Sequence, residues 1–327
     1  MKIYLHYNII DGPWGGGNTF MRSLKNYILN DKNLELVEDI NDNPDIILVN
    51  AAHKGQGSLI SIDELLETKF KLYKNRFQRI FNKKSKIVPK IVYRSDGFRS
   101  IYSVNEINVV DILQKNMLFI ADHIVFQNIF SKDSASGITG IDFAENYDFS
   151  IIQNGTNQNI FQTPLNRRQL SKKIKVLSVN WSKNINKGYR EIAHFSDFEN
   201  VESSFIGNWP ESVDSRNVKL IPPIKHAELA KEMQKYDVLL HPSKNDACPN
   251  VCLEALSTGM PIIYHETSGI DEIAQGCGIV YNSANPNESL QKLISEYGDL
   301  LDNIYDKKYQ FSFDRCAKEY IQLFNTL

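Results

Sequence analysis

Short apolar segments alternate with amphipathic segments along the whole chain. Apolar runs of about four to eight residues indicate buried strands, whereas apolar positions at helical spacing, such as Phe20, Leu24 and Ile28, indicate helices. Strands that alternate with helices predict parallel sheets covered by helices on both faces. The predicted strands lie at 2–9, 44–51, 90–96, 148–157, 174–182, 201–208, 237–243 and 260–266, with one more ending near 127. The predicted helices lie at 18–30, 187–198, 226–236, 248–259, 268–276, 288–301 and 313–327, with one more early in 107–128.

The alternation restarts after a polar, proline-containing stretch at 157–173, which indicates two domains. The fold class we expect is α/β, with two Rossmann-like doubly wound domains that face a cleft. The first domain is predicted at 1–160, completed by the C-terminal helix 312–327, and the second at 172–311. Ligands of such sheets bind at the carboxyl ends of the strands, so both domains are expected to contribute to one site.

Composition narrows the function without deciding it. The net charge is −2, so nothing in the overall charge points to nucleic acid. The four cysteines do not form a CxxC pair, which disfavours zinc and a disulfide framework. The N-terminus does not resemble a signal peptide and no apolar run is long enough for a membrane span. We therefore expect a cytoplasmic protein.

A glycine-rich loop follows the first predicted strand and opens a helix. The sequence "DGPWGGGNTF" contains three consecutive glycines, and Gly16 and Gly17 would let the backbone approach a ligand closely. Asn18 or Thr19 is placed to cap the helix, whose free N–H groups attract anions. The spacing is not GxGxxG, so a nicotinamide or flavin fingerprint is absent. A plain flexible turn is the alternative reading.

Two carboxylates surround a predicted helix start in "HPSKNDACPNVCLEALSTG". Asp246 lies in the loop, Pro249 suits the first helical turn, and Glu254 lies about one turn further in. Helical side chains lean toward the N-terminus, so both carboxylates can flank one ligand. Such a site suits a sugar nucleotide, because a carboxylate accepts two hydrogen bonds from a ribose diol while helix amides hold the diphosphate. An ordinary βαβ unit is the alternative.

The same stretch resembles the signature of the retaining glycosyltransferases of the GT-B fold, family 4, also described as glycosyl transferases group 1. Their two glutamates are separated by seven residues and followed by a Gly-x-Pro break, here 259–261. The resemblance implies that Glu254 binds the donor ribose, and that Asp246, which replaces the first glutamate, lies near the donor sugar. It also implies that a backbone segment binds the diphosphate: Cys248, Pro249, Asn250 and Val251.

Other stretches extend the resemblance over most of the chain. "GPWGGGNTFMRSL" resembles the family's N-terminal glycine loop, and "IIQNGTNQNIF" resembles the segment before its second domain. In "LSVNWSKNINKGY", Lys187 matches the lysine of the donor-phosphate loop, whereas the family's arginine has no clear counterpart. Lys183 lies near that place and is expected to supply the second charge. Two cations facing a diphosphate would stabilise it as it leaves.

Several residues of the first domain are candidates for the other side of the cleft. In the resemblance, Asp96 occupies the strand end where many family members have a histidine near the reacting sugar; a turn-forming Asp-Gly is the equal alternative. Arg94 and Arg99 would bind an anionic acceptor or the donor phosphates, or pair with Asp96. His53 also follows a strand. His241, which precedes Pro242, is expected to be packed instead.

The stretch 69–90 carries nine lysines and arginines among aromatic and aliphatic residues. At helical spacing it would lie on an anionic membrane surface, although a solvated amphipathic helix is the commoner outcome. Peripheral contact with the inner membrane face would suit a lipid-linked acceptor.

These patterns predict a glycosyltransferase of the hexosyltransferase type. It would move a sugar from a nucleotide-diphosphate donor to a glycan or lipid-linked acceptor hydroxyl, with retention of anomeric configuration, in bacterial surface-glycan synthesis. No cofactor and no metal are expected, because Lys187 and helix N-termini can bind the phosphates. The alternatives are a nucleotide-sugar epimerase on the same scaffold and a non-catalytic nucleotide-sugar-binding module.

Overall fold

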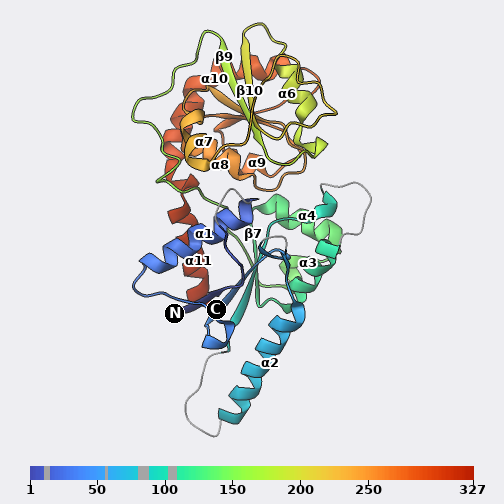
Figure 1. Cartoon of the computed structure of the whole chain (residues 1–327), viewed down its shortest axis with the longest axis vertical. Helices are drawn as coiled ribbons and strands as arrows, with labels where there is room; N and C mark the ends of the chain where they lie inside the picture. The colour runs from blue at the N-terminus through green and yellow to red at the C-terminus, as the bar shows by residue number, and fades with distance from the viewer. Residues whose placement is uncertain (11–14, 56–57, 80–87, 102–108) are drawn as a thin grey trace. The chain divides into compact units, whose positions relative to one another are not determined.

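The computed structural model describes residues 1–10, 15–55, 58–79, 88–101 and 109–327, except for the side chains of 72–79 and of Arg99. The chain divides into two compact units (Figure 1). Unit 1 consists of Met1–Gln153 and Ala317–Leu327, and unit 2 consists of Asn154–Cys316. Both contain a six-stranded parallel sheet, so the prediction of an α/β fold with two doubly wound halves is confirmed.

The sheet of unit 1 has the order β2-β1-β3-β6-β7-β8 and all its described pairings are parallel. The central strand β3 is buried at all five positions, as expected for a parallel strand covered on both faces. A two-stranded antiparallel hairpin, β4 and β5, lies outside this sheet. The strands are β1 (Lys2–Leu5), β2 (Glu35–Val37), β3 (Ile46–Asn50), β4 (His53–Gly55), β5 (Ser58–Leu59), β6 (Lys90–Ser95), β7 (His123–Phe126) and β8 (Phe149–Ile151).

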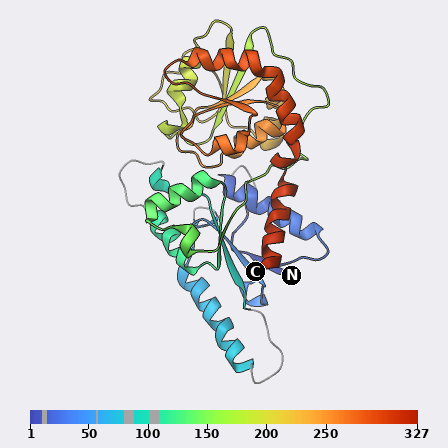
Figure 2. The same cartoon turned by 180° about the vertical axis from the view of Figure 1, so that it is seen from behind.

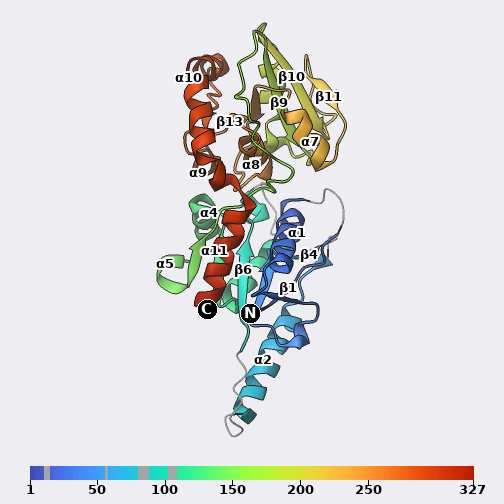
Figure 3. The same ribbon diagram turned by 90° about the vertical axis from the view of Figure 1, so that its left-hand side faces the viewer.

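Helices cover both faces of this sheet. The rings of Phe20 on α1 and Tyr320 on α11 lie 5.1 Å apart, so these helices pack side by side on one face (Figures 1 and 3). The other face carries an apolar cluster from β3, β6 and β7 together with residues of α2, α3, α4 and α5. The elements are α1 (Gly15–Asn30), α2 (Ile62–Arg79), α3 (Val109–Ile120), α4 (Ile129–Thr139), α5 (Phe143–Asn146), α11 (Phe313–Thr326), η1 (Ile40–Asp42) and η2 (Arg99–Ile101).

The sheet of unit 2 is parallel with the order β11-β10-β9-β12-β13-β14. Successive strands run outward from β9 on one side and from β12 on the other, so the direction of winding reverses between β9 and β12. Ligands of doubly wound sheets bind beyond the carboxyl ends of the strands at such a reversal. The strands are β9 (Ile174–Asn180), β10 (Val201–Gly207), β11 (Lys219–Ile221), β12 (Val238–His241), β13 (Ile262–Tyr264) and β14 (Gly278–Val280).

Two apolar clusters, one on each face, hold this sheet between its helices (Figure 2). One cluster joins α7, α8 and α9 to the strands, and the other joins α6 and α10 to them. The elements are α6 (Tyr189–Phe195), α7 (His226–Met233), α8 (Asn250–Ser257), α9 (Ile270–Ala274), α10 (Pro286–Lys307), η3 (Ile185–Lys187) and η4 (Lys308–Phe311).

The segment after β8 belongs to unit 2 from Asn154 onward. The backbone of Thr156 explains this, because its N–H donates to Phe311 (2.8 Å) and its carbonyl accepts from Phe313 (2.8 Å). The Thr156 hydroxyl also bonds that of Ser257 on α8, at 2.5 Å. These bonds tie the start of the unit to its last turn before α11.

Candidate functional site

The loop after β9 places Lys187 beside the end of β12. Asn184 caps η3 by accepting from the Asn186 N–H at 3.0 Å, and Gly188 ends it with φ 78°. A Cβ on Gly188 would lie 2.5 Å from the carbonyl oxygen of Pro242. Only glycine therefore combines this left-handed backbone with such close packing against the residue that follows β12.

Asp246 is the centre of a buried polar cluster beyond β12. Its Oδ2 accepts from Lys187 Nζ at 2.6 Å, Ser243 Oγ at 3.2 Å and His241 Nε2 at 3.3 Å. Asp246 is 7% exposed and His241 1% exposed. The prediction for His241 was that it packs inside the domain; the structure places it there and also in contact with a predicted site residue.

The charges in this cluster follow from its contacts. Burial by itself would raise the pKa of the Asp246 carboxyl, but the Lys187 ammonium and the His241 hydrogen bond hold that pKa well below its usual range. Burial lowers the pKa of His241, more than the nearby carboxylate raises it. Asp246 is therefore ionised and His241 is neutral at pH 7.

Backbone bonds hold the Asp246 loop against the connection between β13 and α9. Asn245 adopts φ 57°, and its N–H donates to the Thr267 carbonyl at 2.8 Å. The Gly269 N–H donates to the Asp246 carbonyl at 2.9 Å. The loop is thus fixed by backbone hydrogen bonds at Asn245 and Asp246, which holds the Asp246 side chain in place.

Helix α8 begins directly after this loop. Pro249 is its N-cap residue and makes no side-chain cap hydrogen bond. The Asn250 side chain instead accepts from Asn154 Nδ2 at 3.0 Å. The segment predicted to bind the diphosphate, Cys248, Pro249, Asn250 and Val251, therefore forms the start of α8, and N–H groups at a helix start attract anions.

Glu254 lies in the second turn of α8 and is 6% exposed. Its Oε1 is 3.9 Å from Nε2 of His226 on α7, and within the described chain its carboxyl accepts no hydrogen bond. Burial raises the pKa of Glu254 to about 8. Such a buried, unsatisfied carboxyl is costly for the free protein and is typical of functional sites.

The structure thus brings Lys187 and Asp246 into contact and places Glu254 on the helix that follows Asp246. Lys183 lies elsewhere: its ammonium is 3.4 Å from Glu211, and both side chains are exposed, at 54% and 95%. Among the described residues, Lys183 forms no hydrogen bond or ion pair with Lys187 or Asp246.

Sequence reasoning missed further polar residues at this edge of the sheet. Asn180 ends β9, is 6% exposed, and its Nδ2 has no hydrogen-bond partner within the described residues. Ser243 and His226 contact the two predicted carboxylates. Their position in the sequence could have identified Asn180 and His241 as candidates. They are the last residues of the two strands that flank the winding reversal.

In unit 1, residues 11–14 of the glycine loop lie outside the described residues, and the part from Gly15 onward packs on the end of β3. Helix α1 begins at Gly15, so Asn18 and Thr19 lie inside the helix and do not cap it. Asn18 instead exchanges two hydrogen bonds with the backbone of Ile10, at 3.0 and 3.1 Å. A Cβ on Gly17 would lie 2.5 Å from Asn50 Nδ2, whereas Gly16 is exposed.

Arg94 supports this loop from within unit 1. It is 1% exposed, Nη1 donates to Asn50 Oδ1 at 2.6 Å, and the guanidinium lies 4.3 Å from the centre of the Phe20 ring. The predicted acceptor-side arginine thus has a packing role in the free protein, holding Asn50 against Gly17.

The remaining unit 1 candidates lie at or beyond strand ends. Asp96 follows β6, is partly exposed, and its charge adds to burial in raising the pKa of Tyr7. His53 opens β4 and is partly buried. Arg99 begins η2, but its side chain lies outside the described residues.

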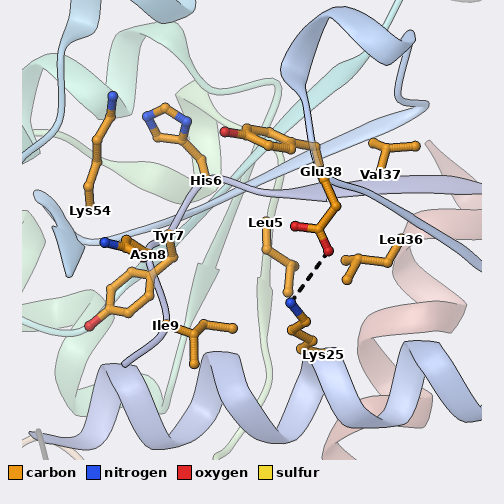
Figure 4. A pocket seen from close by; sticks show the side chains of 11 residues that line it. Leu5, His6, Tyr7, Asn8, Ile9, Lys25, Leu36, Val37, Glu38 and Lys54 are labelled. Carbon is orange, nitrogen blue, oxygen red and sulfur yellow. Dashed lines mark hydrogen bonds and ion pairs between the residues drawn. The ribbon is translucent and has the colours of Figure 1, made fainter. Parts of the chain in front are cut away.

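Unit 1 also contains a cavity of about 290 Å³ at the carboxyl end of β1 (Figure 4). Lys25 and Glu38 form an ion pair across its wall at 3.5 Å. His6 is 2% exposed, and burial lowers its pKa to about 4. Both His6 ring nitrogens are enclosed and have no partner among the described residues, so they face protein and not the open cavity. The lining is Tyr4, Leu5, His6, Tyr7, Asn8, Ile9, Lys25, Leu36, Val37, Glu38 and Lys54.

The basic stretch 69–90 is described only in part. Helix α2 ends at Arg79, the side chains of 72–79 are not described, and 80–87 lie outside the described residues. In the described chain, no helix is both long enough and apolar enough to cross a bilayer. No group of three or more His, Cys, Asp or Glu side chains in the same residues could hold a metal ion.

Comparisons with known proteins agree with the fold. Residues 179–299 match the family model described as glycosyl transferases group 1. No curated protein sequence matches the chain. Sucrose-phosphate synthase from Thermosynechococcus elongatus is 14% identical with a TM-score of 0.68, over 99% of this chain and 98% of that one.

Two further solved structures cover both chains equally well. HepE from Anabaena, in complex with UDP-glucose, is 13% identical with a TM-score of 0.64 over 100% of each chain. WaaG, a glycosyltransferase involved in lipopolysaccharide biosynthesis, is 14% identical with a TM-score of 0.61 over 99% of each chain. At these identities the likeness establishes the fold, which is that of GT-B glycosyltransferases.

Proposed function

We propose that this protein is a glycosyltransferase that moves a sugar from a nucleotide-diphosphate donor to an acceptor hydroxyl, with retention of anomeric configuration. The observation that carries the proposal is the Lys187–Asp246 pair beyond β9 and β12, followed by Glu254 in α8. These residues lie within 179–299, the part that matches the glycosyltransferase family model. The UDP-glucose complex of a protein with the same fold supports a nucleotide-sugar donor.

Each group has a role that its environment suits. Glu254 would accept hydrogen bonds from the ribose hydroxyls, because they would satisfy a buried carboxyl that accepts no hydrogen bond from the described residues. The amides at the start of α8 and the Lys187 ammonium would bind the diphosphate. Asp246 would bind a hydroxyl of the transferred sugar, since it stays ionised beside Lys187.

The reaction replaces one bond at the anomeric carbon by another. The bond from C1 to the diphosphate oxygen breaks, the acceptor oxygen bonds to C1, and the acceptor's proton passes to the departing diphosphate or to water. Negative charge grows on the departing diphosphate, where Lys187 and the α8 amides would stabilise it most. We propose that this charge stabilisation comes from the protein itself and that the reaction needs no metal or cofactor.

Unit 1 would supply the acceptor side, with Asp96 near the reacting sugar and Gly16 and Gly17 beside the donor phosphates. His53 and Arg99 are the proposed acceptor-side residues, and the buried Arg94 would act on that side indirectly, by holding Asn50 against Gly17. The UDP-glucose complex of HepE supports a hexose donor, and the lipopolysaccharide role of WaaG supports a glycan or lipid-linked acceptor in bacterial surface-glycan synthesis. Contact of 69–90 with the inner membrane face belongs to the same proposal.

The first test is calorimetric titration of the purified chain with UDP, GDP, UDP-glucose and GDP-mannose. Binding of at least one nucleotide, weakened about tenfold or more in Glu254→Gln, is the expected result. Glu199→Gln, an exposed glutamate in the same unit, is the control. Unchanged affinity in Glu254→Gln would refute the site.

Product analysis separates the alternatives. A glycosyltransferase releases nucleoside diphosphate together with free sugar in slow hydrolysis, or with a longer glycan once an acceptor is added. An epimerase of the same fold converts the sugar into an isomer of the same mass without an acceptor. Chromatography that separates sugar isomers detects this product. Tight nucleotide binding with neither reaction would indicate a binding module.

A further inference from the structure

The two carboxylate oxygens of Asp246 have different environments. Oδ2 accepts from three donors, namely Lys187 Nζ, Ser243 Oγ and His241 Nε2. Oδ1 accepts from no group within the described residues. An isolated carboxylate can rotate about its Cβ–Cγ bond and exchange its oxygens, but here three donors converge on one of them. The side chain is thus held with Oδ1 directed away from its anchors.

The three donors are not equivalent as anchors. In the proposed function, which this inference presupposes, Lys187 turns part of its hydrogen-bonding capacity to the diphosphate when donor binds. Ser243 has a hydroxyl that rotates freely about its C–O bond. The His241 ring is 1% exposed and lies at the end of β12, so its position is fixed by the sheet.

The proton on His241 can be assigned from its partner. An ionised carboxylate only accepts hydrogen bonds, so Nε2 must carry the hydrogen that points to Oδ2. Nδ1 is then an acceptor, and it is buried without a partner in the described chain. A buried polar atom without a hydrogen-bond partner lowers the stability of the folded protein. We infer that the ring is retained because its other nitrogen, Nε2, binds Asp246.

We propose that His241 is a positioning residue that fixes Asp246 through Oδ2, so that Oδ1 is presented to a hydroxyl of the donor sugar. His241 itself touches neither donor nor acceptor in this assignment. The shorter side chain of aspartate suits the arrangement, because its carboxylate stays within reach of the strand end. Loss of His241 should therefore weaken recognition of the sugar and leave recognition of the nucleotide almost unchanged.

The experiment compares the affinity for UDP-glucose with that for UDP, or the GDP pair if the wild type prefers guanine. The first variant is His241→Leu, which removes the hydrogen-bond donor to Asp246. The second is His241→Gln, whose Nε2 can donate in place of the ring nitrogen. His194→Gln is the control, because His194 is exposed on α6. We expect His241→Leu to lower the affinity for the sugar nucleotide about tenfold and to change the affinity for UDP less than twofold. His241→Gln should recover most of the lost affinity for the sugar nucleotide.

A second measurement does not depend on any ligand or on the folding of a variant. Two-bond ¹H–¹⁵N correlation spectra of histidine-labelled wild type report the tautomer of each ring. A neutral Nε2–H tautomer for His241 at pH 7 supports the proposal, and an Nδ1–H tautomer overturns it. Equal losses of UDP and UDP-glucose affinity in His241→Leu would also overturn it, whereas a wild type that binds no nucleotide would refute the proposed function itself.

Discussion

Lys187 Nζ lies 2.6 Å from Asp246 Oδ2 in the ligand-free chain. The cation expected to face the donor diphosphate is thus already in contact with the carboxylate expected to face the donor sugar. Both side chains are largely buried, at 20% and 10% exposed, so each neutralises a charge that would otherwise be poorly solvated. Donor binding must therefore compete for Lys187, and removing either partner should affect both stability and affinity.

Replacing Lys187 by Met should leave a buried carboxylate without its cation. We expect the free energy of unfolding to fall by about 2 kcal/mol, less than for a fully buried pair because Lys187 is partly exposed. Urea titration measures this, and Lys183→Met, which breaks only an exposed pair with Glu211, should cost less than about 0.5 kcal/mol. The double variant Lys187→Met with Asp246→Asn should regain part of the loss; a simple sum of the two effects would argue against the pair.

Replacing Glu254 by Gln should stabilise the protein at alkaline pH. Burial raises the pKa of Glu254 to about 8, whereas the unfolded chain ionises it near 4.3, so the folded state binds the extra proton between these values. The contribution of this group to stability therefore falls as pH rises from about 4.5 to 8. The Glu254→Gln variant lacks that loss of stability. We expect its free energy of unfolding at pH 8 to exceed that of wild type by roughly 2 kcal/mol.

Urea titrations of both proteins at pH 5 and pH 8 test this dependence, with Glu199→Gln as the exposed control. The same variant should lose donor affinity, because a neutral amide accepts weaker hydrogen bonds from a ribose diol. The stability difference between Glu254→Gln and wild type should be larger at pH 8 than at pH 5. An equal difference at both pH values would mean that Glu254 is not protonated in the folded chain.

Lengthening Asp246 to Glu should impair the site even though the resembling family has glutamate there. The added methylene moves the carboxylate by about 1.5 Å, so Lys187, His241 and Ser243 can no longer all reach one oxygen. We expect a loss of about 1 kcal/mol in stability and a weaker preference for sugar nucleotide over nucleotide. Calorimetry on Asp246→Glu measures both affinities, and an increased preference would show that the three-donor cluster does not define the sugar contact.

Replacing Gly188 by Ala should displace Lys187. The backbone has φ 78° and the new Cβ would lie 2.5 Å from the Pro242 carbonyl, so both strain and a backbone clash oppose the change. We expect the free energy of unfolding to fall by about 2 kcal/mol or more, and the nucleotide affinity to fall as well. Gly137→Ala is the matched control, since its Cβ would meet nothing within 4 Å in the interior of α4; it should be neutral or stabilising in thermal unfolding.

The pattern of apolar residues was sufficient to predict the architecture. Buried parallel strands are nearly continuous apolar runs, so β3, β6, β9 and β12 were recognised from the sequence. Short edge strands were missed, including β2, β11 and β14, because three residues with little burial carry no periodic signal. The fold class could thus be read locally, while the edges of each sheet could not.

The chemistry of the site divides in the same way. Asp246, Glu254 and Lys187 were identified from the sequence, because residue type and spacing along one loop and one helix are local properties. The tertiary structure placed Lys187 against Asp246 and Lys183 against Glu211, because the Gly188 contact with Pro242 and the Lys244–Asn186 backbone bond hold the Lys187 loop beside the end of β12. It also showed that Arg94, a sequence-based candidate for binding an anionic acceptor, is buried and supports Asn50. The physical reason is that burial and hydrogen-bond partners depend on which strand ends become neighbours: Lys187, which follows β9, meets His241 and Asp246 at the end of β12 only when β9 and β12 pair.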